Sequence, residues 1–173
     1  MTSPHHSSDA ISIQTHDFDV GEEHQQLRKD SPSIGAIVTF TGIVRELYNN
    51  AEEPLKDKKE PEKVDLFLEH YAGMTEKVLA DIIHQAKQRW AITHVRIIHR
   101  IGHLSLNDQI VFIGVNSPHR ADAFSAAAFI MDFLKTDAPF WKKEITSTKE
   151  EWVAAKTSDA RASNHWISTE QQT

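Results

Sequence analysis

The sequence predicts an α+β fold with a mainly antiparallel sheet. Segments with period-two alternation or dense β-branched residues recur along the chain, and two longer segments carry apolar residues as helices do. The length of 173 residues and a hydrophobic content of 39% suit one compact domain. We therefore predict a single domain over residues 11–160, between a disordered tail at 1–10 and a C-terminal tail at 161–173.

The N-terminal part of the domain predicts a short strand, a helix and a longer strand. Residues 11–13 suit a strand, and residues 21–29 carry acids early and bases late, as a helix dipole favours. Residues 35–44 (GAIVTFTGIV) are rich in β-branched side chains and lack helical spacing. They predict a largely buried strand with Arg45 at its C-terminal end.

A charged segment separates this strand from the next one. Residues 47–63 contain charges of both signs, two prolines and almost nothing apolar, which predicts a mobile loop. Residues 64–71 (VDLFLEHY) alternate as a strand. We expect the loop to join two antiparallel neighbours in a long hairpin.

A helix and a second hairpin follow. Residues 74–90 place six apolar side chains on one helical stripe that should face the core: Val78, Leu79, Ile82, Ile83, Ala86 and Trp90. Residues 94–101 and 109–116 are two strand-like segments separated by a turn around Gly102 and Asn107-Asp108. We predict that these two strands pair with each other.

The C-terminal third predicts one more helix and one more strand. Residues 121–134 (ADAFSAAAFIMDFL) form an Ala-rich, nearly buried helix that begins at Ser117 or Pro118. Pro139 stops that helix, and residues 140–146 (FWKKEIT) alternate as a short strand. Residues 149–156 are expected to form a helical turn or two.

Composition excludes several classes of function. The chain contains no cysteine, so disulfides, thiolate metal sites and cysteine nucleophiles are ruled out. A net charge of -6 opposes non-specific binding to nucleic acid or to an anionic membrane surface. No apolar run reaches the roughly 18 to 20 residues of a membrane span, and we expect a cytoplasmic protein. The eleven histidines include no convincing helical His-x-x-x-His pair, so no metal and no cofactor are expected.

The start of the helix at 121–134 is a candidate phosphate site. Ser117, Pro118, His119 and Arg120 precede it, and the free N–H groups of a helix N-terminus favour an anion. The alternative is that His119 and Arg120 only cap and solvate the first turn, although cations are electrostatically misplaced there. The residues alone leave both interpretations open.

Three further basic residues stand near the end of that helix. Lys135 shares a helix face with Met131 and can project into a pocket, although the helix dipole favours a lysine there in any case. Alternation in FWKKEIT places Lys142 and Glu144 on one face and Lys143 on the other. Lys142 can therefore pair with Glu144, either as a surface ion pair or as an oriented lysine in a pocket.

The spacing of these residues predicts a site shared between two chains. His119 and Lys135 are 16 residues apart, which in a helix is roughly 24 Å and too far for one small substrate. If both serve one site, a homodimer must bring the helix start of one subunit near the helix end of the other. The dimer is a hypothesis at this point.

Five ordered segments resemble the molybdopterin synthase catalytic (large) subunit family: VTFTGIVR at 38–45, LEHYAGMTEK at 68–77, HRIGHL at 99–104, SPHR at 117–120 and FIMDFLKTDAPFWKKE at 129–144. The resemblance implies an α/β hammerhead with an additional antiparallel β subdomain. It implies a sulfurtransferase that converts cyclic pyranopterin monophosphate into molybdopterin for molybdenum cofactor biosynthesis. The implied partner is a small ubiquitin-like sulfur carrier with a C-terminal Gly-Gly thiocarboxylate, two of which join a homodimer in a heterotetramer.

The resemblance also implies roles for individual residues. Lys135 is the main catalytic candidate and Lys142 its helper. A channel for the tail of the partner is implied at Phe40 and Met131. The implied substrate pocket combines residues of all three basic segments: Ile43, Val44, Arg45, His119, Arg120, Lys135, Lys142, Lys143 and Glu144.

The chain departs from the family pattern at two places, and its basic residues also suit two other functions. The insert at 47–63 is longer than the family leads us to expect, and Lys156 stands where an arginine often follows the WVxA motif. A non-catalytic receptor could use the same basic residues to grip a C-terminal carboxylate. A metal-independent phosphoesterase is disfavoured because no glycine-rich phosphate loop is present.

Overall fold

A computed structural model of the chain describes residues 9–29, 33–45, 65–146, 150–153 and 165–166. The elements in chain order are β1 (Ala10–Gln14), α1 (Val20–Lys29), β2 (Ala36–Ile43), β3 (Asp65–His70), α2 (Met74–Arg89), β4 (His94–Arg100), β5 (Gly102–Leu104), β6 (Gln109–Ser117), α3 (Arg120–Asp137), β7 (Phe140–Ile145) and β8 (Glu150–Val153). The predicted mobile loop at 47–63 lies outside the described residues, as do residues 1–8.

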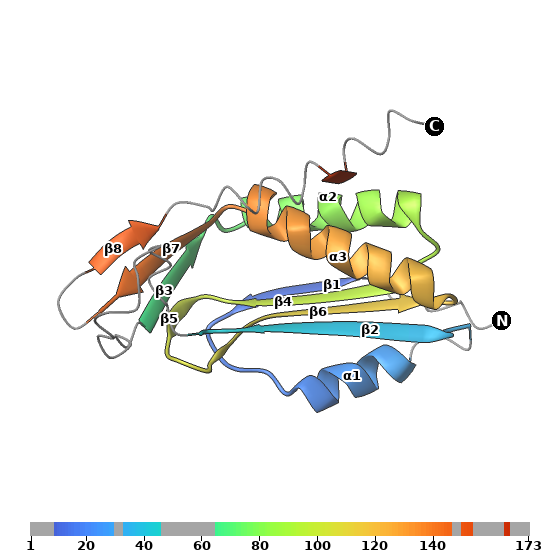
Figure 1. Ribbon diagram of the computed structural model, residues 1–173, viewed down its shortest axis with the longest axis horizontal. Helices are drawn as coiled ribbons and strands as arrows, with labels where there is room; N and C mark the ends of the chain where they lie inside the picture. Colours follow the sequence, from blue (N-terminus) through green and yellow to red (C-terminus); the bar gives the residue numbers. More distant parts are fainter. Residues whose placement is uncertain (1–8, 30–32, 46–64, 147–149, 154–164, 167–173) are drawn as a thin grey trace, which may run out of the picture.

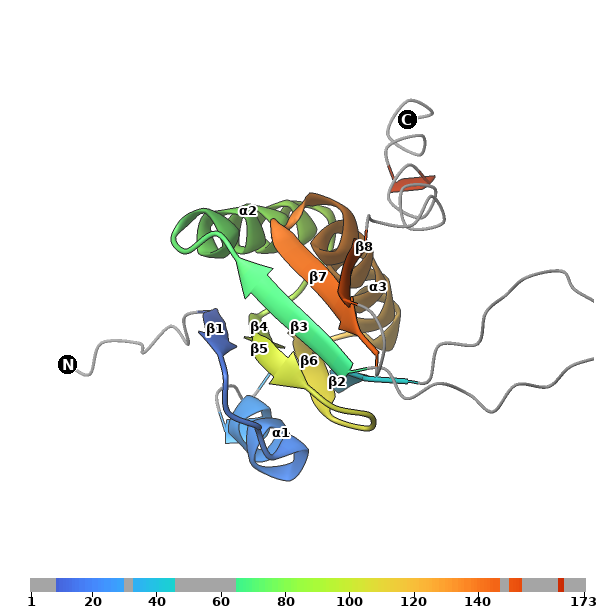
Figure 2. The same ribbon diagram turned by 90° about the vertical axis from the view of Figure 1, so that its left-hand side faces the viewer.

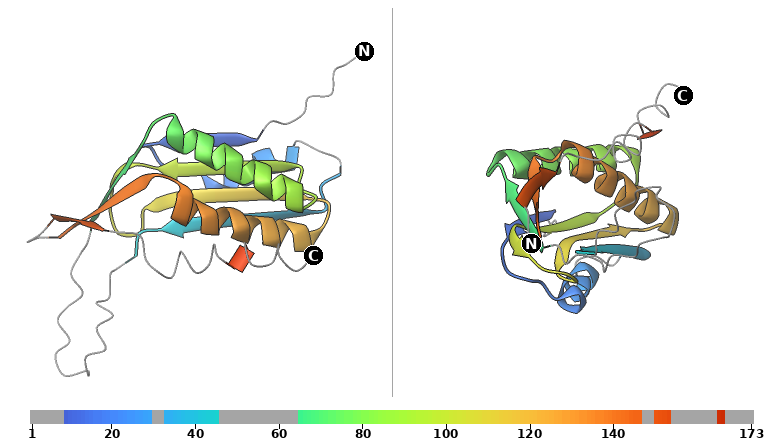
Figure 3. Two further views of the ribbon diagram at one scale, coloured as in Figure 1. Left: turned by 90° about the horizontal axis from the view of Figure 1, so that it is seen from above. Right: turned by 60° about the vertical axis from the view of Figure 1, so that its left-hand side comes forward.

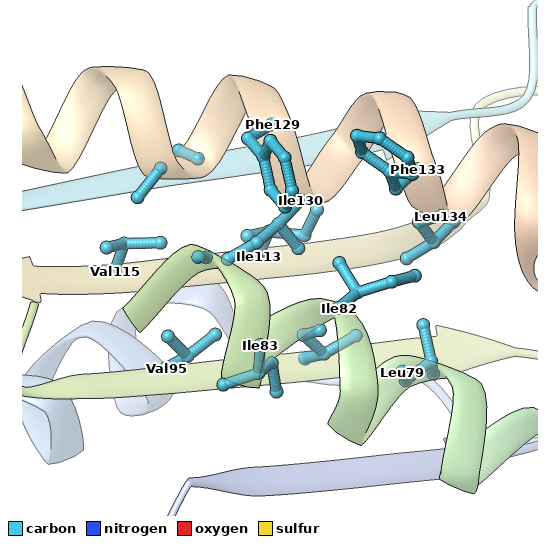
Figure 4. Packing of buried hydrophobic residues seen from close by; sticks show 14 of the residues in the cluster. Leu79, Ile82, Ile83, Val95, Ile113, Val115, Phe129, Ile130, Phe133 and Leu134 are labelled. Carbon is cyan, nitrogen blue, oxygen red and sulfur yellow. The ribbon is translucent and has the colours of Figure 1, made fainter. Parts of the chain in front are cut away.

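The first sheet has the strand order β1-β4-β6-β2 and carries most of the core. Only β1 runs parallel to its neighbour, and the other pairings are antiparallel. Helices α2 and α3 lie side by side on one face, and α1 covers the other (Figure 1, Figure 3). Figure 4 shows how leucine, isoleucine and phenylalanine side chains of α2 and α3 meet valine and isoleucine side chains of β4 and β6. Fully burying each such side chain contributes about 1.5 to 3 kcal/mol.

The second sheet has the order β5-β3-β7-β8 and is antiparallel throughout. It stands at one end of the first sheet, beyond the last turn of α3 (Figure 2). A separate small core of Leu66, Leu68, Leu104 and Val44 lies beneath it. This sheet is the additional antiparallel subdomain, so the predicted fold class is confirmed.

Four expectations for individual elements were wrong. β2 and β3 do not form a hairpin, because β2 pairs with β6 in the first sheet and β3 pairs with β5 and β7 in the second. β2 is not largely buried, because it is an edge strand and Phe40 and Ile43 are exposed. α3 is not buried all round, since Phe124 is 64% exposed. Residues 150–153 are a strand and not a helical turn, because they pair with β7.

The other helices and strands agree with their predicted positions to within a few residues, and the hairpin of β4 and β6 is confirmed. The short strand β5 within its connection was not predicted; the chain enters it at Gly102, whose φ of 82° suits glycine. In the described part of the chain, no helix is long and apolar enough to cross a membrane.

Candidate active site

The candidate residues divide between the two ends of α3. The start of β2 lies opposite the end of β6, and the end of β2 lies opposite the start of β6. α3 follows β6 directly and packs on both strands, so it runs back along the sheet (Figure 1). His119 and Arg120 therefore lie at one end of the sheet and Lys135 at the other.

The second sheet begins at the same end as the last turn of α3. Gly42 and His99 both lie opposite Val111, near the end of β2, the end of β4 and the start of β6. The ring of Phe140, the first residue of β7, stacks on the ring of His99 with 3.7 Å between centroids. Lys142 follows two residues later, so β7 carries it to the end of the sheet where α3 finishes.

Lys142 and Glu144 form an ion pair on the inner face of β7. The Nζ atom of Lys142 lies 2.9 Å from Oε1 of Glu144, and the two side chains keep 33% and 23% of their exposure. Leu68 lies opposite Lys142 and Leu66 opposite Glu144. Directly opposed residues share one face of a sheet, and both leucines belong to the second core. The pairing predicted from alternation is confirmed, and the lysine is half-buried beside apolar side chains.

Lys143 points to the other face of the same sheet. Its Nζ atom lies 2.9 Å from a carboxylate oxygen of Glu150 and 5.3 Å from the ring centroid of Trp152. The hydrogen bond and the charge of Lys143 hold the pKa of the Glu150 carboxyl below its usual value. Lys143 is therefore engaged away from the face that carries Lys142 and Glu144.

The last residue of β2 and the two residues that follow it have different environments. Ile43 is exposed, whereas Val44 is buried in the second core with Leu66. The backbone of Val44 is fixed on both sides, because its N–H donates to Asp108 and its carbonyl accepts from Asn107 at 2.9 Å each. Arg45 is exposed. Val44 thus holds the strand end in place, while its two neighbours face outward.

The start of α3 is fixed by hydrogen bonds around Ser117. The Ser117 hydroxyl donates to the carbonyl of Ala91 at 2.7 Å and accepts from the backbone N–H of His119 at 3.0 Å. Asp122 in the first turn accepts from the backbone N–H of Ala91 at 3.3 Å. His119 and Arg120 are exposed, and His119 is the N-cap without a side-chain capping bond. Both side chains are available to an anion at this helix end.

Phe40 and Met131 lie on the side of the sheet that α3 covers. Val38, on the same face of β2 as Phe40, packs against the main core, and so does Met131. Phe40 is 41% exposed at the sheet edge. Met131 lies one helical turn before Lys135, which is itself exposed. Phe40 and Met131 therefore lie on the same side of the sheet, with Met131 one helical turn from Lys135.

Sequence reasoning missed the aromatic contact that anchors β7. His99 and His70 come from two different strands, and both lie near the ring of Phe140. The only signal in the sequence was a pair of histidines in strand segments, which patterns of hydrophobicity cannot bring together. Among the described residues, no group of three or more His, Asp or Glu side chains is placed to hold a metal ion.

Comparisons with known proteins agree on one family. The family model described as MoaE protein matches residues 13–137. A molybdopterin synthase catalytic subunit from Vibrio cholerae serotype O1 is 47% identical over 156 residues, covering 90% of this chain and 97% of that protein. Molybdopterin cofactor biosynthesis protein E from Burkholderia multivorans aligns with a TM-score of 0.73 and 43% identity, covering 92% of this chain and 97% of that one.

A more distant structure shares the fold. It is described as a protein–protein complex of subunits 1 and 2 of molybdopterin-converting factor from Helicobacter pylori. The matched chain has a TM-score of 0.66 and 18% identity, with 84% of this chain and 91% of that chain covered. At this identity the likeness concerns the fold alone.

Proposed function

The chain belongs to the MoaE family of molybdopterin synthase catalytic subunits, and on this premise we propose that it transfers sulfur from the C-terminal thiocarboxylate of a small ubiquitin-like carrier to cyclic pyranopterin monophosphate. The product is the dithiolene of molybdopterin. Two sulfur atoms enter each product, so two thiocarboxylates are consumed. The absence of cysteine fits this role, because the sulfur arrives on another protein.

The ion pair of Lys142 with Glu144 is the observation that supports this proposal best. Glu144 holds the Lys142 ammonium at 2.9 Å in a half-buried position, where a fixed positive charge acts more strongly than in bulk water. Lys135 lies in the last turn of α3, at the same end of the first sheet. We assign Lys135 the main catalytic role and Lys142 the helping role, both offsetting negative charge as the thiocarboxylate attacks and the cyclic phosphate opens.

The opposite end of α3 supports a phosphate-binding role in a composite site. His119 and Arg120 are exposed where the helix N-terminus favours an anion, but roughly 24 Å of helix separates them from Lys135. A second subunit would supply these two residues to the lysines of the first. The exposed Phe124 on α3, beside the edge strand β2, is an apolar surface available for such a homodimer.

The remaining residues have supporting roles in the same proposal. Ile43 and Arg45 would contact the substrate, and the buried Val44 between them would anchor this segment to the second core. Phe40 and Met131 would line the channel for the carrier tail. With one carrier on each subunit, the assembly is a heterotetramer, and the Helicobacter pylori complex of subunits 1 and 2 is a precedent for such a partner. Lys143 is the exception, because Glu150 and Trp152 hold it on the other face.

Dithiolene formation from purified components tests the proposal. The chain is mixed with thiocarboxylated carrier and cyclic pyranopterin monophosphate, and native protein is compared with Lys135→Ala and Lys142→Ala. Lys29→Ala is the matched control, because Lys29 is also an exposed lysine in the last turn of a helix, but on the opposite face of the sheet. Activity lost in the first two variants and kept in the control supports the assignment. Tight carrier binding without activity in the native protein would instead indicate a receptor.

A further inference from the structure

A buried contact between two rings joins the two sheets next to the candidate site. The ring of His99 on β4 and the ring of Phe140 on β7 have centroids 3.7 Å apart and planes inclined by 15°. His99 is 6% exposed. His70 on β3, directly opposite Phe140 in the register, lies 6.3 Å from the same ring. One aromatic side chain at the start of β7 thus contacts residues of both sheets.

The His99 ring is held in one orientation. Its Nδ1–H donates to the carbonyl of Arg100 at 2.8 Å. The Arg100 guanidinium is itself fixed, because it donates to the carbonyl of Gln109 at 3.0 Å and pairs with Asp17 at 3.3 Å. Burial, with a contribution from the charge of His70, lowers the pKa of His99 to about 4. At neutral pH the ring is therefore an uncharged, fixed surface against which Phe140 packs.

The backbone before and at Phe140 is also restrained. The carbonyl of Pro139 accepts from the N–H of Tyr71 at 3.4 Å and from the hydroxyl of Thr75 at 3.5 Å. The N–H of Phe140 donates to the carbonyl of Ala138 at 2.8 Å. Phe140 pairs with β3 alone, and β8 joins the pairing from Lys142 onward. The place of Phe140 therefore sets where β7 enters the part of the sheet that holds Lys142.

Lys142 is the next residue of β7 on the same face as Phe140. We propose that His99 is a positioning residue, whose ring sets the place of Phe140 and thereby the place of the Lys142 ammonium relative to Lys135. This inference rests on the proposed function, because it assumes that Lys142 acts in sulfur transfer. His99 itself is buried beneath the strand and need not touch the substrate.

Substitutions of the two rings test this inference in the dithiolene assay. His99→Leu removes the aromatic ring, and His99→Phe keeps a ring while removing the hydrogen bond. Because errors of about 1 Å in placement can cost on the order of 100-fold in rate, we expect His99→Leu to lower kcat roughly 10- to 100-fold with KM changed less than about threefold. His99→Phe should recover most of that loss.

A double variant and a packing control separate positioning from simple destabilisation. If both substitutions act by removing the same contact between the two rings, the double variant His99→Leu/Phe140→Leu should lower kcat no further than the more impaired of the two single variants. Ile98→Ala is the control, because Ile98 is the neighbouring fully buried residue of β4 but packs on the α1 side. It should lower the melting temperature while leaving kcat unchanged. If His99→Leu does not fold, Phe140→Leu removes the same contact and is judged by the same criteria.

The possible failures are distinguishable. Native activity in Lys142→Ala would show that the role proposed for Lys142 is wrong. An inactive Lys142→Ala together with native kcat in folded His99→Leu and Phe140→Leu would overturn the positioning role alone. The positioning role would also be overturned if Ile98→Ala and His99→Leu lowered the melting temperature equally and lowered kcat equally.

Discussion

The Nζ atom of Lys142 lies 2.9 Å from Oε1 of Glu144 on the face of β7 that meets the second core. On the opposite face of the same strand, Lys143 makes an equally short pair with Glu150, but next to an exposed tryptophan. The two pairs are matched in chemistry and differ in environment. The two lysines are similarly exposed, at 33% for Lys142 and 25% for Lys143, but Glu144 keeps 23% of its exposure whereas Glu150 keeps 60%. The pair on the inner face is therefore the one whose carboxylate is half-buried.

Glu144→Gln is expected to lower activity while leaving the fold intact. The variant removes the charge that orients Lys142, and we expect kcat to fall on the order of tenfold, within the range that positioning effects reach. Partly exposed ion pairs contribute little to stability, so the free energy of unfolding should change by less than about 1 kcal/mol. Initial rates of dithiolene formation and urea unfolding measure the two effects.

Glu150→Gln is the control for that experiment. It breaks the pair with Lys143 on the other face of β7, and it should leave kcat within about twofold of native, since exposed pairs are weakly coupled to their surroundings. Equal losses in the two variants would mean that the inner face of β7 has no special role.

Protonation of His99 should make the protein less stable in mild acid. The pKa of His99 is about 4 in the folded chain and 6.5 in the reference state, because burial disfavours the charged ring. The unfolded chain therefore binds the proton first, and stability is lost as pH falls from 6.5 toward 4. The whole effect is on the order of 3 kcal/mol.

Urea unfolding at several pH values between 7.5 and 5, compared with His99→Phe, measures this contribution. Other titrating groups are common to both proteins and cancel in the difference. The native protein should lose stability relative to the variant as the pH is lowered. Parallel curves for the two proteins would contradict the depressed pKa.

Gly35→Ala should disturb the start of α3, although Gly35 is far from this helix in the sequence. A Cβ atom at Gly35 would lie 2.2 Å from the carbonyl oxygen of Pro118, which is backbone and has little room to yield. Such overpacking typically costs about 1 to 3 kcal/mol. Because Pro118 directly precedes His119 and Arg120, we also expect KM for the pterin substrate to rise.

Thermal unfolding and KM measurements test the effect of Gly35→Ala against Gly21→Ala. An added Cβ at Gly21 meets only the flexible carboxylate of Asp19, at 3.0 Å. The control should keep the native KM. A raised KM in both variants would show that the effect does not come from the helix start.

Local sequence patterns were sufficient to predict the features of the site that depend on residues close together in the chain. Alternation in FWKKEIT was sufficient to place Lys142 and Glu144 together, and helical rise was sufficient to separate His119 from Lys135. The division into two sheets was implied by the family resemblance and not by these local patterns, because strand periodicity does not state which strand is the partner. The contact of His99 with Phe140 joins residues 41 positions apart on different sheets, and no local pattern encodes such a contact.

Trp166, within the predicted C-terminal tail, should contribute to stability from outside the two sheets. Its Nε1–H donates to Asp132 on α3 at 2.9 Å, and its ring meets those of Trp90 and Phe129 at 5.5 and 5.7 Å. Because the ring is only half-buried, we expect Trp166→Ala to cost about 2 kcal/mol, below the 3 to 5 kcal/mol of a fully buried tryptophan. Trp166→Phe, which keeps the ring contacts and loses the hydrogen bond, should cost about 1 kcal/mol. Urea unfolding measures both, with the exposed Trp141→Ala as the control of the same residue type. A loss in Trp166→Ala no larger than in that control would show that the C-terminal segment does not stabilise the helix layer.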